Sequence, residues 1–279
     1  MSTYQGKRVF ITGGSSGIGR STAMTLVRDG AHVCIGARGK KRLDATLSEL
    51  KAAASVTGQK IGAVTIDIAD KDSVKEAAAN VLEILGGIDV LINNAGIAHC
   101  NRVTATETSD YEEMMRVNYF GTVYVTQAFL PQMIAQKSGA IANVSSLSGI
   151  IGIYGYTAYT PSKFAVVGYS ECLRQELLEH KISVSVVYPA DTDTPQLEQE
   201  NVTKPQETKA IAGKVTLMSP NAVAKIMLEG IAAKKFTIVP GSSTKFVRFM
   251  YRHFPWMVRW MLDGDVKKSQ RKSGATTAA

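Results

Sequence analysis

The sequence predicts an α/β fold built on one parallel sheet with helices on both faces. Short apolar runs of strand length alternate with longer segments of helical periodicity, which is typical of βαβ units. A glycine-rich turn separates the first apolar run from the first helical segment. Together these features predict a Rossmann-type, doubly wound parallel sheet of seven strands.

The expected strands are apolar runs of four to six residues. In chain order they are Arg8–Thr12, His32–Gly36, Ile61–Ile66, Asp89–Asn93, Ala140–Ser145, Ser183–Tyr188 and Phe236–Val239. The helical segments between them are Ile18–Asp29, Lys41–Ala54, Lys71–Leu85, Tyr111–Gln136, Pro161–His180 and Pro220–Ala233. Because such sheets bind ligands outside the carboxyl ends of their strands, we expect the loops that follow the strands to face one crevice.

We expect one domain over residues 1–240 and a basic, aromatic extension over residues 241–279. Residues 190–217 lack helical or strand periodicity over most of their length and are too long for a simple connection, which favours a substrate lid. Thr194 and Pro195 suit the N-cap and the first position of a short helix within this lid. Residues 273–279 are expected to be disordered.

The composition is that of an ordinary globular protein, with 45% hydrophobic residues and a mean hydropathy of -0.01. No apolar stretch approaches the roughly 18 residues of a spanning helix, and the polar start of the chain differs from a signal peptide. We therefore expect a cytoplasmic protein, free or at the cytosolic face of a membrane, and not a secreted one. Cys34, Cys100 and Cys172 show neither metal-ligand spacing nor a disulfide framework, so no metal site is expected.

The net charge of +8 is concentrated near the C-terminus. Lys245 to Lys272 contains eight basic and two acidic residues, and aromatic residues alternate with arginines over 245–262. Such a segment can lie in a membrane interface, cover the substrate pocket or form an oligomer interface. Pro255 argues against one continuous amphipathic helix. Nucleic-acid binding is disfavoured because the segment is short and no partner fold accompanies it.

The glycine-rich turn has the features of a site for the pyrophosphate of a dinucleotide. It follows the first strand directly and runs into a helix. Glycines there permit a sharp turn and close approach to phosphate, and the helix N-terminus presents free N–H groups. The residues assigned to this contact are Gly13, Ser15, Ser16, Gly17, Ile18 and Gly19.

The residues after the second strand predict NADPH as the cofactor. An NAD site usually places a carboxylate here, whereas this chain has Arg38 and no acid. Arg38 is expected to meet a 2′-phosphate, with Lys40, Lys41, Arg42 or the Ser15 hydroxyl as helpers. The alternative, that the cations are the solvated start of a helix, suits Lys40 and Lys41 better than Arg38.

Further cofactor contacts are expected after the third and fourth strands. Asp67 is placed to accept a hydrogen bond from the adenine amino group. Asn94, Ala95 and Gly96 supply small residues where the chain passes the cofactor. The alternative for the asparagine is an ordinary turn residue.

Tyr159 and Lys163 lie four residues apart on one face of an expected helix. A nearby ammonium and a positively charged nicotinamide favour phenolate, so we expect them to lower the pKa of Tyr159 from about 10. Tyr159 would then donate a proton to a carbonyl oxygen in reduction and accept one in oxidation. Ser146, at the end of the fifth strand, can hydrogen-bond the same oxygen, and Asn118 can hold a water that links Lys163 to solvent.

These motifs, in this order, resemble the classical short-chain dehydrogenases/reductases over residues 7–240. The matching residues are Thr12-Gly13-x-x-x-Gly17-x-Gly19, Asn94-Ala95-Gly96, Asn118, Ser146 and Tyr159-x-x-x-Lys163. The resemblance implies an NADP-dependent oxidoreductase whose catalytic residues are Asn118, Ser146, Tyr159 and Lys163. It also implies a dimer or tetramer built on the fourth and fifth long helices. The further cofactor contacts that it implies are Tyr159, Lys163, Ile68, Pro189, Thr192 and Thr194.

Two details bear on the tyrosine motif. Tyr154 and Tyr156 are set aside as the proton donor because neither has a lysine four residues later. Pro161 is less usual inside the family's motif, but proline fits the first turn of a helix.

The loop after Tyr188 resembles that of one subfamily, the 3-ketodihydrosphingosine reductases. It reads Pro189-Ala190-Asp191-Thr192-Asp193-Thr194-Pro195, followed by Glu200-Asn201 and Thr203-Lys204-Pro205. The subfamily has proline at the place of Ala190, and the resemblance does not extend into the C-terminal extension. It implies NADPH-dependent reduction of the 3-keto group of 3-ketodihydrosphingosine, a long-chain keto-lipid of sphingolipid biosynthesis, to dihydrosphingosine.

The acidic residues of the lid have two interpretations. Asp191 or Asp193 steers the ammonium group of the substrate, in a stretch that also holds Glu198 and Glu200, or these side chains only cap backbone groups. Two other functions stay open. One is reduction of another lipid, a steroid or a 3-oxoacyl ketone, which the loop disfavours. The other is a non-catalytic NADP(H)-binding scaffold or sensor, which the catalytic set disfavours.

Overall fold

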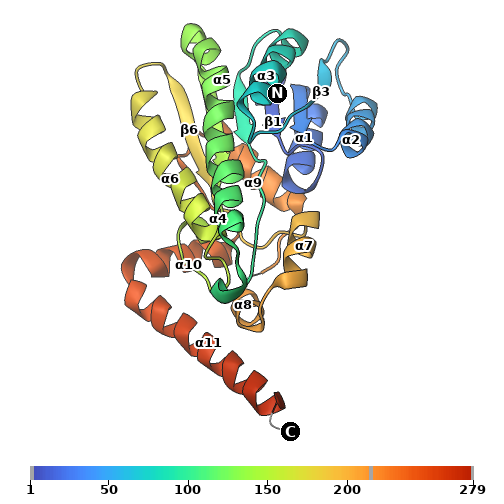
Figure 1. The fold of residues 1–279 in the computed structure, drawn as a ribbon. Helices are drawn as coiled ribbons and strands as arrows, with labels where there is room; N and C mark the ends of the chain where they lie inside the picture. The colour runs from blue at the N-terminus through green and yellow to red at the C-terminus, as the bar shows by residue number, and fades with distance from the viewer. Residues whose placement is uncertain (1–2, 214–215, 278–279) are drawn as a thin grey trace.

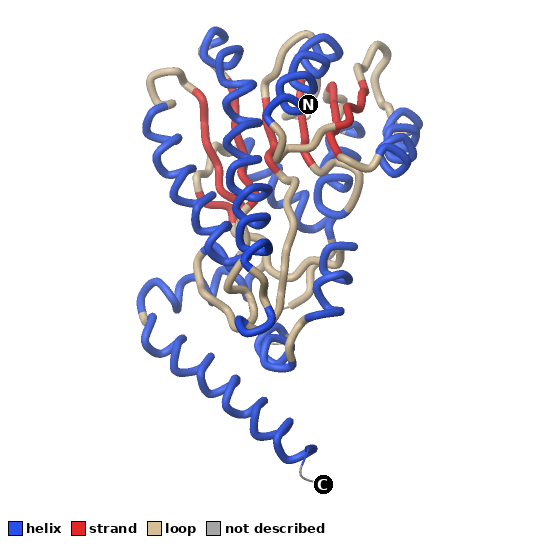
Figure 2. Tube along the Cα trace, viewed as in Figure 1, coloured by secondary structure: helices blue, strands red, loops and turns tan. Residues whose placement is uncertain are grey.

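The computed structural model describes residues 3–213 and 216–277 and contains one parallel sheet between helical layers (Figures 1 and 2). Seven strands lie in the order β3-β2-β1-β4-β5-β6-β7. Their bounds are β1 Arg8–Thr12, β2 His32–Ala37, β3 Ile61–Thr65, β4 Val90–Asn93, β5 Gly139–Val144, β6 Ile182–Val187 and β7 Thr237–Ile238. The expected strands are all present with bounds within one residue, so the Rossmann-type fold class is confirmed.

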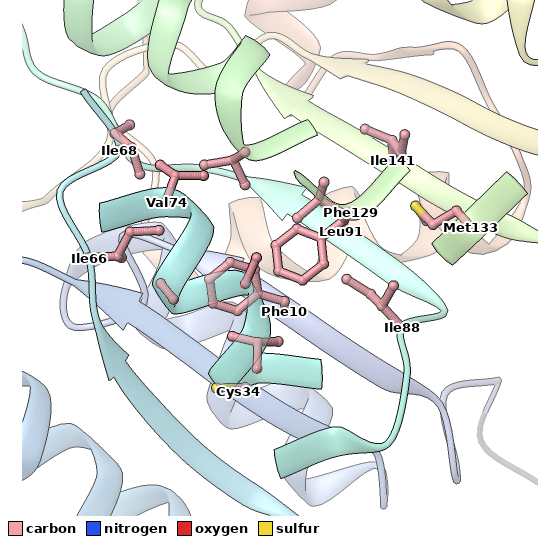
Figure 3. Packing of buried hydrophobic residues seen from close by; sticks show 14 of the residues in the cluster. Phe10, Cys34, Ile66, Ile68, Val74, Ile88, Leu91, Phe129, Met133 and Ile141 are labelled. Carbon is pink, nitrogen blue, oxygen red and sulfur yellow. The ribbon is translucent and has the colours of Figure 1, made fainter. Parts of the chain in front are cut away.

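The main helices form the two layers. Their bounds are α1 Gly17–Arg28, α2 Lys40–Ala52, α3 Lys71–Leu85, α5 Gly121–Gln136, α6 Tyr159–Glu176 and α9 Pro220–Ala232. One apolar core joins the sheet to α3, α5 and α6, and a second joins the opposite face to α1, α2 and α9. In the first core the rings of Phe10 on β1 and Phe129 on α5 lie 5.2 Å apart between their centroids (Figure 3). The sheet is therefore covered on both faces, which accounts for the mostly apolar sequences of its strands.

The strand order reverses beside β1, which pairs with both β2 and β4. Thr12 at the end of β1 is in register with Gly36 on β2, and Asn93 at the end of β4 is in register with Asn143 on β5. The loops after these strands therefore leave the same edge of the sheet, where doubly wound folds bind their ligands.

The segment expected to form one helix from Tyr111 to Gln136 is interrupted. It consists of α4, Thr108–Met114, then a π-helical segment η2, Met115–Phe120, and then α5. It starts earlier than expected because Glu107 and Asp110 form a reciprocal capping box at its N-terminus. A π-helical turn is wider than an α-helical turn, so an apolar pattern that repeats every 3.6 residues in the sequence does not predict η2.

The lid contains more regular structure than the sequence indicates. Two short helices fill most of it: α7 Pro195–Thr203, which begins where a short helix was expected, and α8 Gln206–Ala212, which was not expected. Thr194 caps α7 as expected, because its Oγ1 accepts a hydrogen bond from the N–H of Leu197 at 3.3 Å. The sequence of these helices has no apolar stripe that would predict them. In the structure α7 has no fully buried residue, and the buried face of α8 includes the polar Glu207 and Thr208.

The C-terminal extension forms two helices, α10 Ser242–His253 and α11 Pro255–Thr277, so the break expected at Pro255 is confirmed. Figure 1 shows α11 running outward past α8, against which it packs. Large apolar side chains stay exposed on this extension, including Phe246, Trp256 and Trp260. No helix among the described residues is long and apolar enough to cross a membrane. Disorder over 273–279 remains a prediction: the backbone is helical to Thr277, and residues 278–279 lie outside the described part.

Candidate active site

A cavity of ≈240 Å³ opens at the carboxyl ends of β1, β4, β5 and β6. The glycine-rich turn and the N-terminus of α1 form one wall, and the lid helices α7 and α8 form another. The start of α6, which carries Tyr159 and Lys163, also lines the cavity. The cavity therefore collects residues from five separate stretches of the chain, as the position of the crevice in the fold predicts.

The glycine wall has room for main chain only. A Cβ on Gly13 would lie 2.8 Å from Nδ2 of Asn94, and one on Gly19 would lie 2.3 Å from the carbonyl oxygen of Gly13. A Cβ on Gly17, whose φ is +52°, would lie 2.9 Å from Cγ2 of Thr194. The bare turn and the open N-terminus of α1 thus form a cradle of the kind that accepts a dinucleotide pyrophosphate.

Asn94 fixes the shape of this cradle. Its Nδ2 donates to the carbonyl oxygens of Thr12 and Gly13, at 3.0 and 3.3 Å. In return, Oγ1 of Thr12 accepts from the backbone N–H groups of Asn94 and Ala95, both at 3.1 Å. These bonds join the ends of β1 and β4, so the side chain of Asn94 shapes the site even before any contact with a cofactor.

The expected cofactor residues fall into two groups. Those that line the cavity are Gly13, Ser16, Gly17, Ile18, Asn94, Ala95, Gly96, Tyr159, Lys163, Pro189, Thr192 and Thr194. The lining of this cavity does not include Ser15, Gly19, Arg38, Lys41, Arg42, Asp67 or Ile68. Gly19 still belongs to the cradle through its contact with Gly13. Cofactor contact by the others stays a prediction, which the position of Arg38, exposed directly after β2, permits.

Tyr159, the first residue of α6, is 8% exposed and faces the cavity. The Nζ of Lys163 lies 5.7 Å from the centroid of its ring and donates to the carbonyl oxygen of Val144 at 3.1 Å. Ser146, which follows β5, lines the same cavity, and its Oγ accepts from the N–H of Ser148 at 3.1 Å. The structure thus brings Ser146, Tyr159 and Lys163 together.

The protein raises the pKa of Tyr159, contrary to the lowering expected from the sequence. Burial is the main cause, the carboxylates of Glu200 and Asp191 add to it, and a hydrogen bond with Ser146 opposes it. Burial also lowers the pKa of Lys163 to about 8, while Glu200 acts in the opposite direction. The expectation failed because it counted the cations and not the desolvation of the phenol or the carboxylates of the lid.

Asn118 lies in η2 and is buried beside Lys163. Its Oδ1 accepts from the N–H of Ile97, and its Nδ2 donates to the carbonyl oxygen of Ile97, each at 2.9 Å. The same Nδ2 lies 2.9 Å from Oγ of Ser162. Asn118 therefore ties the loop after β4 to α6, and the water that it was expected to hold stays a prediction.

Tyr156 and Glu200 are site residues that the sequence did not single out for this contact. The Tyr156 hydroxyl donates to Oε2 of Glu200 at 2.7 Å, and the ring of Tyr156 lies 5.5 Å from that of Tyr159. Both residues line the cavity. Tyr156 was set aside only as a proton donor; its contact with a lid residue 44 positions later has no signal in the sequence.

Charged and polar pairs hold the lid over the cavity. Arg102, in the loop after β4, donates to Oε1 of the buried Glu207 on α8 at 3.0 Å. The Nζ of Lys204 lies 3.8 Å from Oδ2 of Asp191. Thr208 donates to the carbonyl oxygen of Tyr154 at 2.8 Å. Asp191 therefore has a cationic neighbour within the lid, and part of its charge is neutralised there.

Comparison with known proteins gives concordant matches. A model of the short chain dehydrogenase family matches residues 7–205. A 3-dehydrosphinganine reductase of Danio rerio is 40% identical over 233 residues, which are 83% of this chain and 70% of that protein. A 3-ketodihydrosphingosine reductase of Mus musculus is 35% identical over 85% of this chain and 72% of that protein. A short chain dehydrogenase/reductase of Burkholderia phymatum, solved in complex with NAD, superposes with a TM-score of 0.81 at 24% identity, covering 92% of this chain and 96% of that one.

Proposed function

Because the chain belongs to the short-chain dehydrogenase family, we propose that it is an NADPH-dependent reductase of 3-ketodihydrosphingosine. It is an oxidoreductase by membership of this family. The observation that carries the proposal is the cavity in which Ser146, Tyr159 and Lys163 lie between a glycine cradle and an acidic lid. The relatives named for 3-dehydrosphinganine or 3-ketodihydrosphingosine reduction support this substrate.

The residues present fit a nicotinamide dinucleotide. The cradle of Gly13, Gly17 and Gly19 would hold the pyrophosphate, and Lys163 would hold the nicotinamide ribose. Arg38 would pair with the 2′-phosphate, which is the basis for proposing NADPH over NADH. When bound, the reduced cofactor supplies the hydride for the carbonyl carbon.

Tyr159 supplies the proton for the carbonyl oxygen. Reduction requires a phenol that carries its proton when the ketone binds, and the raised pKa of Tyr159 keeps it protonated at neutral pH. Ser146 donates a hydrogen bond to the same oxygen as negative charge develops there. Lys163, with a pKa of about 8, is largely cationic at pH 7 and favours the phenolate left after proton transfer.

We also propose that the active form is a homo-oligomer built on α6 and on the helical segment that η2 and α5 form. Phe120, at the end of η2, and Phe164, on α6, are each 43% exposed, and η2 packs against α6. Exposed aromatic side chains on adjacent helices suit a symmetric interface. Light scattering coupled to size exclusion tests this: Phe164→Ser should shift the chain toward monomer, and a monomeric wild type contradicts the interface.

The C-terminal extension is proposed to hold the enzyme at the cytosolic face of a membrane. Trp256 and Trp260 are 69% and 73% exposed, and α10 and α11 also carry most of the excess positive charge. In liposome co-sedimentation, a Trp256→Ser/Trp260→Ser double variant should lose most binding to anionic vesicles. Leu178→Ser, at an exposed apolar residue in the turn after α6, should not. Equal binding by all three proteins contradicts the proposal.

The decisive experiment follows NADPH oxidation with synthetic 3-ketodihydrosphingosine, with NADH and a Tyr159→Phe variant in parallel. We expect turnover with NADPH that falls about 10³-fold in the variant, as for loss of a general acid. Turnover of a 3-oxoacyl thioester in preference to the sphingoid ketone would replace the substrate and keep the mechanism. NADPH binding without turnover of any ketone would favour a scaffold or sensor.

A further inference from the structure

The cavity contains one carboxylate whose hydrogen-bond partners carry no charge. Of the described residues that line it, the charged ones are Lys163, Asp191 and Glu200. Asp191 lies 3.8 Å from Nζ of Lys204. Glu200 instead accepts from two neutral donors, the Tyr156 hydroxyl at 2.7 Å and Nε2 of Gln196 at 3.1 Å. Neutral donors stabilise a carboxylate without cancelling its charge, so Glu200 keeps a negative potential inside the site.

This charge lies close to the reacting centre. Glu200 raises the pKa of both Tyr159 and Lys163, so its field reaches the phenol and the ammonium of the proposed proton-transfer pair. Its partner Tyr156 packs against the ring of Tyr159, with 5.5 Å between the centroids. Glu200 and Tyr159 therefore line the same cavity, and the side chain of Tyr156 contacts both of them.

The proposed substrate carries a cation close to its carbonyl group. A 3-ketosphingoid base has an ammonium group on the carbon next to the carbonyl. Resting on the proposed function, we propose that Glu200 binds this ammonium and thereby selects 2-amino ketones over ketones without the charge. The salt bridge would form inside a partly closed cavity, where it is stronger than at the surface.

Glu200 fits this role better than the aspartates of the same lid. Asp193 is exposed and does not line the cavity, and Asp191 has Lys204 as a neighbour. Glu200 is also held in position, because both of its oxygens have a hydrogen-bond donor. A carboxylate that is already oriented loses little side-chain entropy when a cation binds.

The test compares two short-chain, water-soluble ketones that differ only in the 2-amino group. Glu200→Gln removes the charge but keeps an amide oxygen for the Tyr156 hydroxyl. We expect kcat/KM for the amino ketone to fall about 10- to 100-fold, as for loss of a hydrogen bond to a charged group, with less than about 3-fold change for the deamino ketone. Glu200→Asp should restore part of the preference. Glu198→Gln, exposed on the same helix and outside the cavity, is the matched control and should leave both values unchanged.

A purely structural role for Glu200 predicts a different pattern. If its hydrogen bond to Tyr156 only holds the lid, Tyr156→Phe and Glu200→Gln should lower turnover of both ketones to the same extent. That result overturns the inference, and so does an unchanged preference in Glu200→Gln. A binding readout is inhibition of deamino-ketone reduction by hexylammonium, which should weaken about 10-fold or more in Glu200→Gln. Failure of the wild type to reduce either ketone would refute the proposed function itself, which separates the two failures.

Discussion

The two walls of the cavity are made rigid by different means. On the cofactor side, main-chain atoms and missing side chains define the shape: a Cβ on Gly19 has no room, and Asn94 bonds to carbonyl groups of the turn. On the lid side, side chains distant in the sequence meet one another, as Arg102 meets Glu207. The first wall is fixed by close packing of the main chain, and the second by a few polar pairs between side chains that are distant in the sequence.

This difference indicates how each wall responds to change. In a closely packed region an added atom displaces its neighbours and causes strain. A partly exposed ion pair contributes little to stability, because water can take the place of either partner. We therefore expect substitutions on the cofactor side to have large effects on binding and stability, and those that loosen the lid to have small ones.

The largest expected effect is on the pH dependence of stability and concerns Lys163, a buried residue that lines the cavity. Its pKa is about 8 in the folded protein, below the ordinary lysine value of 10.5, so the unfolded chain binds the proton more tightly. This burial opposes folding below pH 8, and the opposition is lost as pH rises toward 10.5. Between pH 7 and 9.5, the stability of the cofactor-free wild type should rise relative to Lys163→Met, toward a limit of about 3 kcal/mol.

Urea denaturation at each pH measures this difference, with Lys225→Met, at an exposed position on α9, as the control. A difference in the free energy of unfolding between wild type and Lys163→Met that does not change with pH would show that water hydrates the ammonium group of Lys163 in the folded protein.

Gly19→Ala should weaken NADPH binding about 30-fold, equivalent to about 2 kcal/mol. The added methyl would meet the carbonyl oxygen of Gly13 at 2.3 Å, so the turn must shift. Isothermal titration gives the affinity. Gly168→Ala on α6, where a Cβ meets nothing within 4 Å, should bind NADPH like the wild type. An unchanged affinity of Gly19→Ala for NADPH would show that the glycine wall can shift as readily as the lid.

Arg38→Ala should raise the Kd of NADPH roughly 10-fold and leave that of NADH nearly unchanged. The low end of the range for a charged hydrogen bond applies because Arg38 is exposed. Lys51→Ala, also exposed and at the far end of α2, is the control. Equal loss for both cofactors would place the contribution of Arg38 in general charge attraction and not at the 2′-phosphate.

Arg102→Met should lower the free energy of unfolding by about 1 to 3 kcal/mol. The carboxylate of Glu207 is 3% exposed and loses a partner that water reaches poorly, while the side chain of Arg102 is 54% exposed, so the pair that is lost is partly screened by solvent. Limited proteolysis between 195 and 212 should be faster than in the wild type. Arg20→Met, which removes an exposed ion pair with Glu49, should leave that rate unchanged. A decrease in the free energy of unfolding of more than about 3 kcal/mol would show that the lid is held as firmly as the glycine wall.

The sequence predicted the cofactor wall better than the lid for a physical reason. Each strand is a local apolar run, and the turn after β1 shows its function in its own glycines. The lid helices are short, and the partner of Glu207 lies 105 residues away, so neither local periodicity nor composition marks the contact. The direction of the pKa shift of Tyr159 failed likewise, because burial and the field of Glu200 exist only after folding.

The π-helical segment η2 has a consequence for insertions and deletions. Its wider turn sets the rotation at which Asn118 reaches both Ile97 and Ser162. Removing one residue from this stretch would restore a regular α-helix with good backbone geometry, and would turn Asn118 by about 100° away from both partners. The length of this stretch, apart from its composition, is therefore part of the site: a deletion that improves the helix would disconnect the loop after β4 from α6.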